Sequence, residues 1–309
     1  MNYEIVHRTV YEYTSEVSVS QHVVHLTPRN LPGQQCLRHE LVVEPTPALV
    51  TSREDYFGNS TSFFTMAGAH RTLVVTAHSE VALSPRRWPE PNKTPAWERA
   101  RGYADRSENL TIEAQEYIYP SALIPALPAL SEYARPSFSA GRPLLEAVLD
   151  LTRRIFTDFT FDPKATTVST PLEEVMKKRR GVCQDFAHFQ IGCLRTLGLP
   201  ARYVSGYLET LPPPGKTKLV GSDASHAWVQ VFVPDFGWVE VDPTNDVMPS
   251  DRHIVVAWGR DFEDVSPIRG VISGGDKHIL KVAVDVTPLT KKTEALGAST
   301  QSQSSQTQS

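Results

Sequence analysis

The stretch RRGVCQDFAHFQIGCLRTLGLP, residues 179–200, has the pattern of a buried helix with a cysteine at its start. Its apolar residues recur at three- and four-residue steps, which places them on one stripe of a helix. The members of that stripe are Cys183, Ala187, Ile191, Leu194 and Leu197. Gly198 and Pro200 are typical of residues that follow the end of a helix. We therefore expect a central helix that begins near Cys183.

Cys183 is the candidate nucleophile. At the start of a helix, unpaired backbone N–H groups and the helix dipole stabilise a thiolate, and Gly181 lets the backbone turn tightly into the first turn. Cys193 lies inside the helix, where this effect is absent, and we expect Cys193 and Cys36 to pack in the core. The three cysteines form no CxxC pattern and cannot all pair, so each is expected to be a free thiol.

A nucleophilic cysteine needs a base, and the base needs a group that orients it. Downstream, DASHAWVQVFVPDFGWVEVDPTND, residues 223–246, has the pattern of a β-hairpin with PDFG as its turn. His226 and Asp242 lie on its two arms. They are the candidate base and orienting carboxylate, provided that both side chains lie on one face of the hairpin.

The register of the hairpin decides whether His226 and Asp242 can meet. Pairing Val233 with Gly237 would place them diagonally on one face, at a Cβ separation of roughly 7 Å that the two side chains can bridge. Pairing Val233 with Trp238 would place them on opposite faces. The sequence alone does not choose between these registers.

The apolar pattern divides the chain into four segments. Residues 1–84 alternate as β-strands do and are expected to form an antiparallel β-sandwich. Residues 85–140 begin with a proline-rich linker and continue as a helical segment. Residues 141–289 are the expected catalytic core, and they open with an amphipathic helix. Residues 290–309 are a Ser/Gln-rich tail whose composition predicts disorder.

Composition argues against several classes of partner. The 309 residues carry a net charge of −4, which offers no basic surface for nucleic acid or an anionic membrane. The N-terminus lacks the apolar run of a signal peptide, and no later segment approaches the ~18 apolar residues of a membrane span, so we expect a cytoplasmic protein. Cys183 and His188 would diverge by roughly 140° on a helix, and no paired short spacing occurs elsewhere. Neither a metal nor a cofactor is therefore expected.

Two parts of the sequence resemble a known superfamily. Residues 181–208, followed by residues 223–246, are similar to the core of the bacterial transglutaminase-like superfamily. The stretch from YEIVHRTVYEY, residues 3–13, through DYFGNSTSFF, residues 55–64, resembles the β-rich N-terminal region that precedes this core in many bacterial members.

The resemblance implies roles and a fold. It implies that Cys183 is the nucleophile, His226 the base and Asp242 the residue that orients the imidazole. It also implies an α+β fold in which a papain-like cysteine helix packs on an antiparallel sheet, continued by HIVVAWG, residues 253–259, and KHILKVAVDV, residues 277–286. The superfamily contains protein cross-linking enzymes, peptidases, other amidases and inactive binding modules, so the reaction stays open.

The chemistry that such a triad supports begins with attack of the thiolate on an amide carbonyl, which leaves a thioester on Cys183. Water would then complete a hydrolysis, and an amine would complete a transfer. No calcium-ligand pattern and no aromatic tunnel for an amine is recognisable, which favours a peptidase or amidase acting on a peptide or protein substrate. The alternatives are a transglutaminase and a noncatalytic peptide-binding module.

Two further details of the reaction stay open. The backbone N–H of Cys183 is one expected oxyanion donor, and a second donor is not assigned. The loop at residues 211–223 is either a substrate lip or an ordinary solvent-exposed loop.

Overall fold

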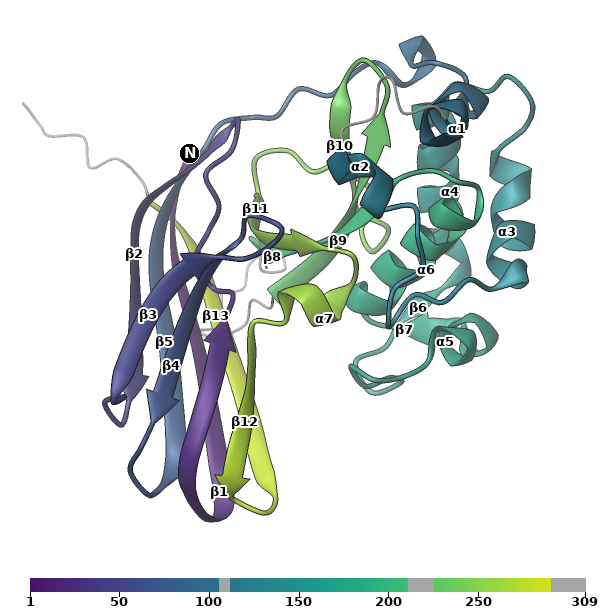
Figure 1. Cartoon of the computed structure of the whole chain (residues 1–309). Helices are drawn as coiled ribbons and strands as arrows, with labels where there is room; N and C mark the ends of the chain where they lie inside the picture. Colours follow the sequence, from purple (N-terminus) through teal and green to yellow (C-terminus); the bar gives the residue numbers. More distant parts are fainter. Residues whose placement is uncertain (106–111, 211–224, 290–309) are drawn as a thin grey trace, which may run out of the picture.

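The computed structural model of the chain describes residues 1–105, 112–210 and 225–289. It shows a mixed α/β architecture in which a large antiparallel sheet lies beside a smaller sheet covered by helices (Figure 1). The loop at residues 211–223 and the tail at residues 290–309 lie outside the described residues.

The large sheet is built around β1, a 23-residue strand. Its residues alternate between buried and exposed positions, as the sequence pattern predicts, with Tyr3, Ile5 and His7 on the buried face. The sheet has seven strands: β1 (Asn2–Val24), β2 (Gln34–Glu44), β3 (Leu49–Glu54), β4 (Ser60–Met66), β5 (His70–Leu83), β12 (Ile268–Gly274) and β13 (His278–Leu289).

The two halves of β1 have different neighbours. The first half pairs with β5 and β13, and the second half pairs with β4 and β12. Side chains from both sets of strands share one apolar cluster, which includes Phe64, Leu73 and Ile272. The hydrogen bonding thus links all seven strands through β1, and the arrangement of residues 1–84 as two packed sheets stays a prediction.

The C-terminal strands correct one expectation. The segment at residues 277–286 was expected to continue the catalytic sheet, but β13 pairs with β1 in the large sheet, from Asn2 opposite Leu289 to Tyr13 opposite His278. Alternation identifies a segment as a strand but does not say which strand edge it meets. The segment at residues 253–259, in contrast, does continue the smaller sheet as β11. The expected boundaries at residues 84 and 140 stay predictions.

The smaller sheet carries the candidate site. Its four antiparallel strands lie in the order β10-β9-β8-β11. Their bounds are β8 (Ala201–Leu208), β9 (Ser225–Val233), β10 (Gly237–Val241) and β11 (His253–Gly259). A short parallel pair, β6 (Thr160–Phe161) and β7 (Arg180–Gly181), leads the chain into the cysteine helix.

Helices cover this sheet (Figure 1). The central one, α6 (Cys183–Thr196), is almost wholly buried against β8 and β9, because its apolar residues surround the helix as well as lining one stripe. The other helices are α1 (Trp97–Asp105), α2 (Ile112–Glu116), α3 (Pro128–Ala134), α4 (Leu144–Asp158), α5 (Leu172–Lys178) and α7 (Phe262–Val265), with 3₁₀ turns η1 (Pro91–Lys93) and η2 (Arg135–Ser137). Within the described ranges, none of these helices has the length and apolar character that a membrane crossing requires.

The large sheet holds β11 directly. The side chain of Gln34 donates to the carbonyl of Val255 at 2.7 Å and accepts from its N–H at 2.8 Å. Asn59 makes the same pair of contacts with the backbone of Trp258, both at 2.9 Å, and the guanidinium of Arg29 lies 3.5 Å from the centre of the Trp258 ring. These contacts fix the strand on which one residue of the candidate site lies.

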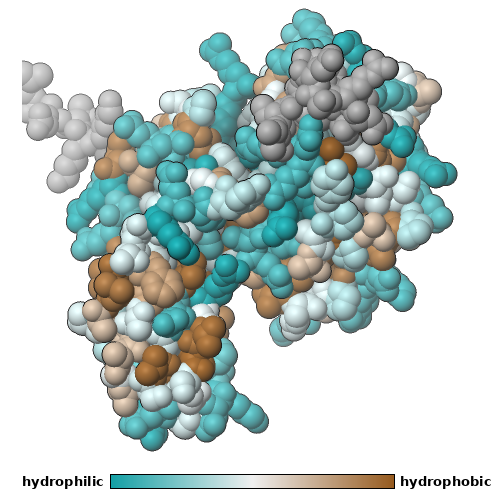
Figure 2. All heavy atoms as spheres, viewed as in Figure 1, coloured by the Kyte–Doolittle hydropathy of each residue, from teal (hydrophilic) through white to brown (hydrophobic). Residues whose placement is uncertain are grey.

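The large sheet exposes apolar side chains on its surface. Exposed apolar side chains on its strands include Leu49, Val50 and Val271. Figure 2 shows hydrophobic patches over this part of the molecule, while the helical part is mostly polar on the face shown.

Candidate active site

The start of α6 is held by a carboxylate. The helix begins at Cys183, and the Val182 N–H before it donates to Asp185 Oδ2 at 2.8 Å. Thr166 donates to the same carboxylate oxygen at 2.6 Å. A Cβ on Gly181 would come within 2.4 Å of this oxygen, so the residue must be glycine for Asp185 to reach back. The predicted helix start is confirmed, with Cys183 half-buried at its first position.

The hairpin adopts the register that brings His226 and Asp242 together. Gly237 pairs with Val233 and Val241 pairs with Val229, as in the first of the two expected registers. Asp242 follows β10 directly, and its Oδ2 lies 2.8 Å from Nε2 of His226. The imidazole of His226 also hydrogen-bonds to the side chain of Cys183. The structure therefore brings the three predicted side chains into one chain of contacts.

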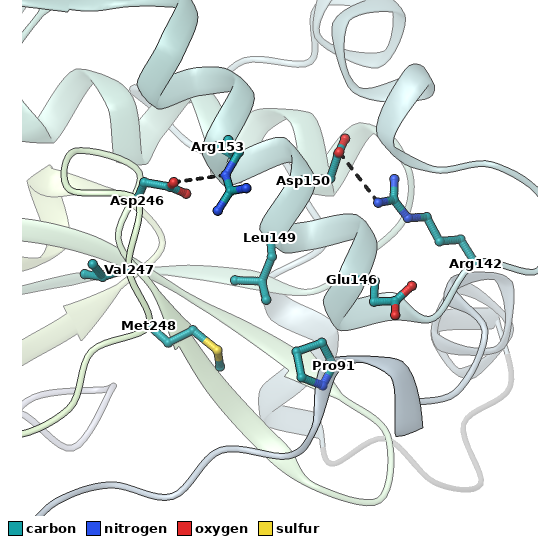
Figure 3. Close-up of a pocket in the computed structure, with 9 residues that line it drawn as sticks. All are labelled: Pro91, Arg142, Glu146, Leu149, Asp150, Arg153, Asp246, Val247 and Met248. Atoms are coloured by element: carbon teal, nitrogen blue, oxygen red, sulfur yellow. Dashed lines mark hydrogen bonds and ion pairs between the residues drawn. The ribbon is translucent and has the colours of Figure 1, made fainter.

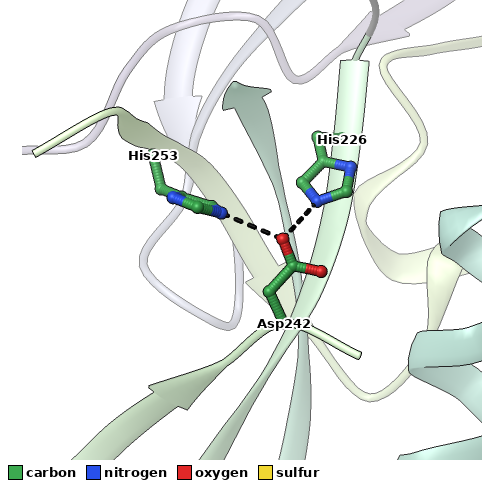
Figure 4. Close-up of side chains that lie close together, drawn as sticks. All are labelled: His226, Asp242 and His253. Atoms are coloured by element: carbon green, nitrogen blue, oxygen red, sulfur yellow. Dashed lines mark hydrogen bonds and ion pairs between the residues drawn. The ribbon is translucent and has the colours of Figure 1, made fainter. Parts of the chain in front are cut away.

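Two residues that the sequence reading missed complete this network. His253, the first residue of β11, places its Nε2 3.0 Å from the same Oδ2 of Asp242 (Figure 4). The amide of Asn245 donates to this oxygen at 2.7 Å, and the Thr244 N–H donates to Oδ1 at 2.9 Å. Asn245 lies in the sequence DPTND, and His253 is the first residue of HIVVAWG. The sequence of these two segments does not indicate that the side chains of Asn245 and His253 contact Asp242.

The network fixes the charges of its members. Burial alone would lower the pKa of His226, but the hydrogen bonds and charges of Asp242 and Cys183 raise it to about 10. Burial alone would raise the pKa of the Asp242 carboxyl, but the hydrogen bonds and charges of His226 and His253 hold it well below its usual value. The arrangement therefore favours an imidazolium at His226 beside a carboxylate at Asp242.

A second buried network supports the imidazoles from behind. The ring of Trp228 stacks on His226, with ring centres 5.9 Å apart, and meets the ring of His253 edge to face at 5.2 Å. Its Nε1 donates to Glu240 at 3.0 Å, and Arg86 forms a buried ion pair with the same carboxylate. The indole N–H is the one hydrogen-bond donor of the Trp228 side chain, and it is bound to Glu240. Trp228 is therefore not available as the second oxyanion donor.

His226, Asp242 and His253 are also residue types that bind metal ions. Within the described part of the chain, His226, Asp242 and His253 place potential ligand atoms within 4.8 Å of one another. However, Asp242 Oδ2 already lies at hydrogen-bond distance from both Nε2 atoms and from the Asn245 amide. These distances and donors fit a hydrogen-bonded carboxylate, in which both imidazoles donate.

His188, whose spacing from Cys183 argued against a metal site, is not part of this cluster. It is buried inside α6, its Nε2 accepts the N–H of Phe262 at 3.2 Å, and burial lowers its pKa to about 4. The side chain is therefore a structural acceptor.

The remaining cysteines are both free thiols, as expected. Cys193 is fully buried, and burial raises the pKa of its thiol far above the usual range. Cys36 is only half-buried on β2, at the edge of the large sheet. The expectation of core packing is confirmed for Cys193 and wrong for Cys36, because an edge strand offers less cover than a central helix.

A pocket lies beside the loop that follows Asp242. It has a volume of about 390 Å³ and lies between that loop and α4 (Figure 3). Two ion pairs border it: Arg153 with Asp246 at 3.1 Å, and Arg142 with Asp150 at 3.6 Å. Its remaining lining residues are Pro91, Glu146, Leu149, Val247 and Met248. Both basic groups of the lining have acidic partners, and Glu146 adds one further acidic side chain.

Comparison with known proteins places the chain in a family. Residues 3–82 match the bacterial transglutaminase-like N-terminal region, and residues 131–243 match the transglutaminase-like superfamily core. The uncharacterised protein Rv2569c of Mycobacterium tuberculosis is 44% identical over 297 residues, which cover 93% of this chain and 92% of that protein. A protein-glutamine gamma-glutamyltransferase of Pseudomonas aeruginosa is 33% identical over 126 residues, which cover 40% of this chain and 19% of that protein.

A solved structure has the same fold over most of its length. The crystal structure of a protein from Cytophaga hutchinsonii, described as a candidate cysteine protease, aligns with a TM-score of 0.70 at 20% identity and covers 94% of this chain and 92% of that one. Together with the two matched regions and the similarity to Rv2569c, this shows that the chain belongs to the bacterial transglutaminase-like superfamily.

Proposed function

We propose that the protein is a cysteine-dependent amide hydrolase, a peptidase or amidase that works through a thioester on Cys183. The observation that carries the proposal is that His226 hydrogen-bonds on one side to Cys183 and on the other to the buried Asp242. This is the order of contacts that a nucleophile, a base and an orienting carboxylate require. The proposed substrate is a peptide or protein amide, and a cytoplasmic location is part of the same proposal.

The proposed reaction has two halves. In the first, the Cys183 sulfur attacks the amide carbonyl, and the imidazolium of His226 protonates the departing amine. In the second, His226 takes a proton from water, which attacks the thioester and releases the carboxylic acid. Asp242 stays ionised throughout and stabilises the imidazolium. The N–H of Cys183 is the proposed oxyanion donor, because the first N–H groups of a helix have no intrahelical partner.

Transfer to an amine is the second candidate. The observation that favours it is the similarity of 126 residues to the glutamyltransferase of Pseudomonas aeruginosa. Both reactions share the first half, and they differ only in whether water or an amine attacks the thioester. A noncatalytic peptide-binding module would keep the fold and use neither half.

One experiment separates these candidates. The full chain is incubated with a pool of glutamine-containing peptides, with and without a labelled primary amine, while ammonia, new carboxylate and bound label are followed together. New carboxylate without label supports the hydrolase, and label incorporated faster than hydrolysis supports the transferase. If the wild-type protein, like Cys183→Ala, forms neither product, the binding module is favoured. The Cys183→Ala variant is the control for contaminating activity.

A further inference from the structure

Asp242 Oδ2 is shared between two imidazoles. It lies 2.8 Å from Nε2 of His226 and 3.0 Å from Nε2 of His253, and the side chain of Asp242 is fully buried. A carboxylate oxygen has no proton to give, so each Nε2 carries the proton of its own hydrogen bond. The two histidines therefore act as donors to one acceptor (Figure 4).

His253 comes from a strand outside the hairpin that carries His226 and Asp242. It opens β11, which pairs with β8 at the opposite edge of the small sheet from β10. Its carbonyl accepts from Arg86 Nη2 at 3.1 Å, and Gln34 holds the backbone of β11 two residues further on. The backbone at His253 is therefore held from the linker and the large sheet, on the side of the small sheet away from β10.

The position of His253 is determined on every side by described residues. The residue is only 5% exposed, and its ring meets the ring of Trp228 edge to face. The titratable or charged groups that contact His253 are His226, Asp242 and Arg86. Asp251 and Arg252 precede it in the chain, and Glu240 is the ion-pair partner of Arg86. Among them, Asp242 receives the Nε2 hydrogen bond of His253.

We propose that His253 is a positioning residue, which donates its Nε2 proton to Asp242 and thereby holds the carboxylate in the orientation that aligns His226 with Cys183. The proposal rests on the function proposed for Cys183, His226 and Asp242. Asp242 also accepts hydrogen bonds from His226, from the Asn245 amide and from the Thr244 N–H, which come from the hairpin and the turn that follows it. His253 adds a donor from a different strand, which restricts rotation of the carboxylate further. Hydrogen-bond partners that orient metal-binding side chains typically change activity by about 10- to 100-fold, and we expect an effect of similar size at His253.

The test compares His253→Gln with His253→Asn. The amide nitrogen of Gln can take the place of the imidazole Nε2, whereas the shorter Asn places its amide where Nδ1 was and leaves Asp242 without this donor. Both substitutions are polar and smaller than histidine, so they alter packing in similar ways. The difference between them isolates the hydrogen bond to Asp242.

The first measurement is the rate of Cys183 alkylation by iodoacetamide as a function of pH, with Cys36 and Cys193 monitored by mass spectrometry. We expect the Gln variant to follow wild type, and the Asn variant to react about 10-fold more slowly near neutral pH. We also expect the acid limb of the Asn profile to lie at higher pH, because a less well-held carboxylate stabilises the imidazolium less. Equal profiles for the two variants, whether both slow or both fast, would overturn the proposal.

Two additions keep the test decisive. If the Asn variant does not fold, as judged by circular dichroism, His253→Met replaces it as a side chain of similar length without a donor. Steady-state hydrolysis is then measured, and the proposal expects kcat to fall and KM to stay unchanged in the donor-free variant. Because alkylation needs no substrate, the role of His253 is scored even if no hydrolysis is found, in which case only the proposed function fails.

Discussion

Cys183 and Cys193 are two thiols on one helix in opposite surroundings. Cys183 is half-buried in the first turn of α6 and hydrogen-bonds to His226. Cys193 is fully buried further along, where burial alone raises the pKa of its thiol. The helix supplies both residues, but Cys183 interacts with His226 of β9, whereas Cys193 lies in the core. The comparison teaches that the helix places a cysteine and the strand beside it decides what that cysteine can do.

Two buried histidines show the same dependence on a partner. The pKa of His226 is raised to about 10, although burial lowers it, because Asp242 and Cys183 hydrogen-bond to the ring. The pKa of His188 is lowered to about 4 by burial, which outweighs the nearby charge of Asp261. A direct hydrogen bond to a carboxylate thus reverses the effect of a similar degree of burial.

The largest expected effect comes from the two cysteines. Cys183→Ala should lower the rate of amide cleavage by about 10⁴-fold or more, because the covalent route is lost. Cys193→Ala should leave kcat unchanged and lower the melting temperature, because it removes a buried core sulfur about three helical turns from Cys183. Steady-state kinetics and thermal unfolding of both variants check this. Full activity in Cys183→Ala would refute the assignment of the nucleophile.

Asp242→Asn should lower kcat by about 10²- to 10⁴-fold. The loss of the carboxylate charge should also lower the pKa of His226 from its value of about 10. The alkaline limb of the wild-type pH–rate profile should therefore lie near pH 10, and that of the variant at lower pH. An alkaline limb that does not move would show that Asp242 does not act on His226.

The polar support behind the imidazoles should matter for stability. Arg86→Met leaves Glu240 as an unpaired charge in the interior, which should cost about 3–5 kcal/mol in the free energy of unfolding. Lys281→Met, which removes the exposed partner of Glu12, should cost no more than about 1 kcal/mol. Urea unfolding at one pH measures both. Similar losses in the two variants would contradict a buried role for the Arg86 ion pair.

The two buried histidines should also differ in the pH dependence of stability. The pKa of His226 is raised from 6.5 to about 10 on folding, so its contribution is full below pH 6.5 and is lost as the pH rises toward 10. The pKa of His188 is lowered from 6.5 to about 4, so its contribution is full above pH 6.5 and is lost as the pH falls toward 4. Each slope is about 1.4 kcal/mol per pH unit within its window.

The matched variants His226→Gln and His188→Gln reveal these slopes. The difference in the free energy of unfolding between wild type and His226→Gln should shrink as the pH rises above 6.5. The difference for His188→Gln should shrink as the pH falls below 6.5. If these differences in the free energy of unfolding changed with pH in the same direction for both variants, the contrast between His226 and His188 would be wrong.

Local sequence patterns predicted several elements of this structure. The helix that starts at Cys183 and the hairpin that joins His226 to Asp242 were both predictable, because amphipathic period and turn residues act over a few neighbours. Strand β13 was equally recognisable as a strand, yet its partner was predicted wrongly. The edge of β1 that it meets lies more than 260 residues away in sequence, and no local pattern encodes that pairing.

The sequence by itself determined which side chains are available: a cysteine at a helix start, a histidine on one strand and an aspartate at the end of the next. Only the tertiary structure decided the register that places Gly237 opposite Val233, and with it the contact between His226 and Asp242. Only the tertiary structure also brought His253 from β11 to the same carboxylate. The physical reason is that period and turn chemistry specify elements locally, whereas register and strand order are settled by which faces pack together across the whole chain.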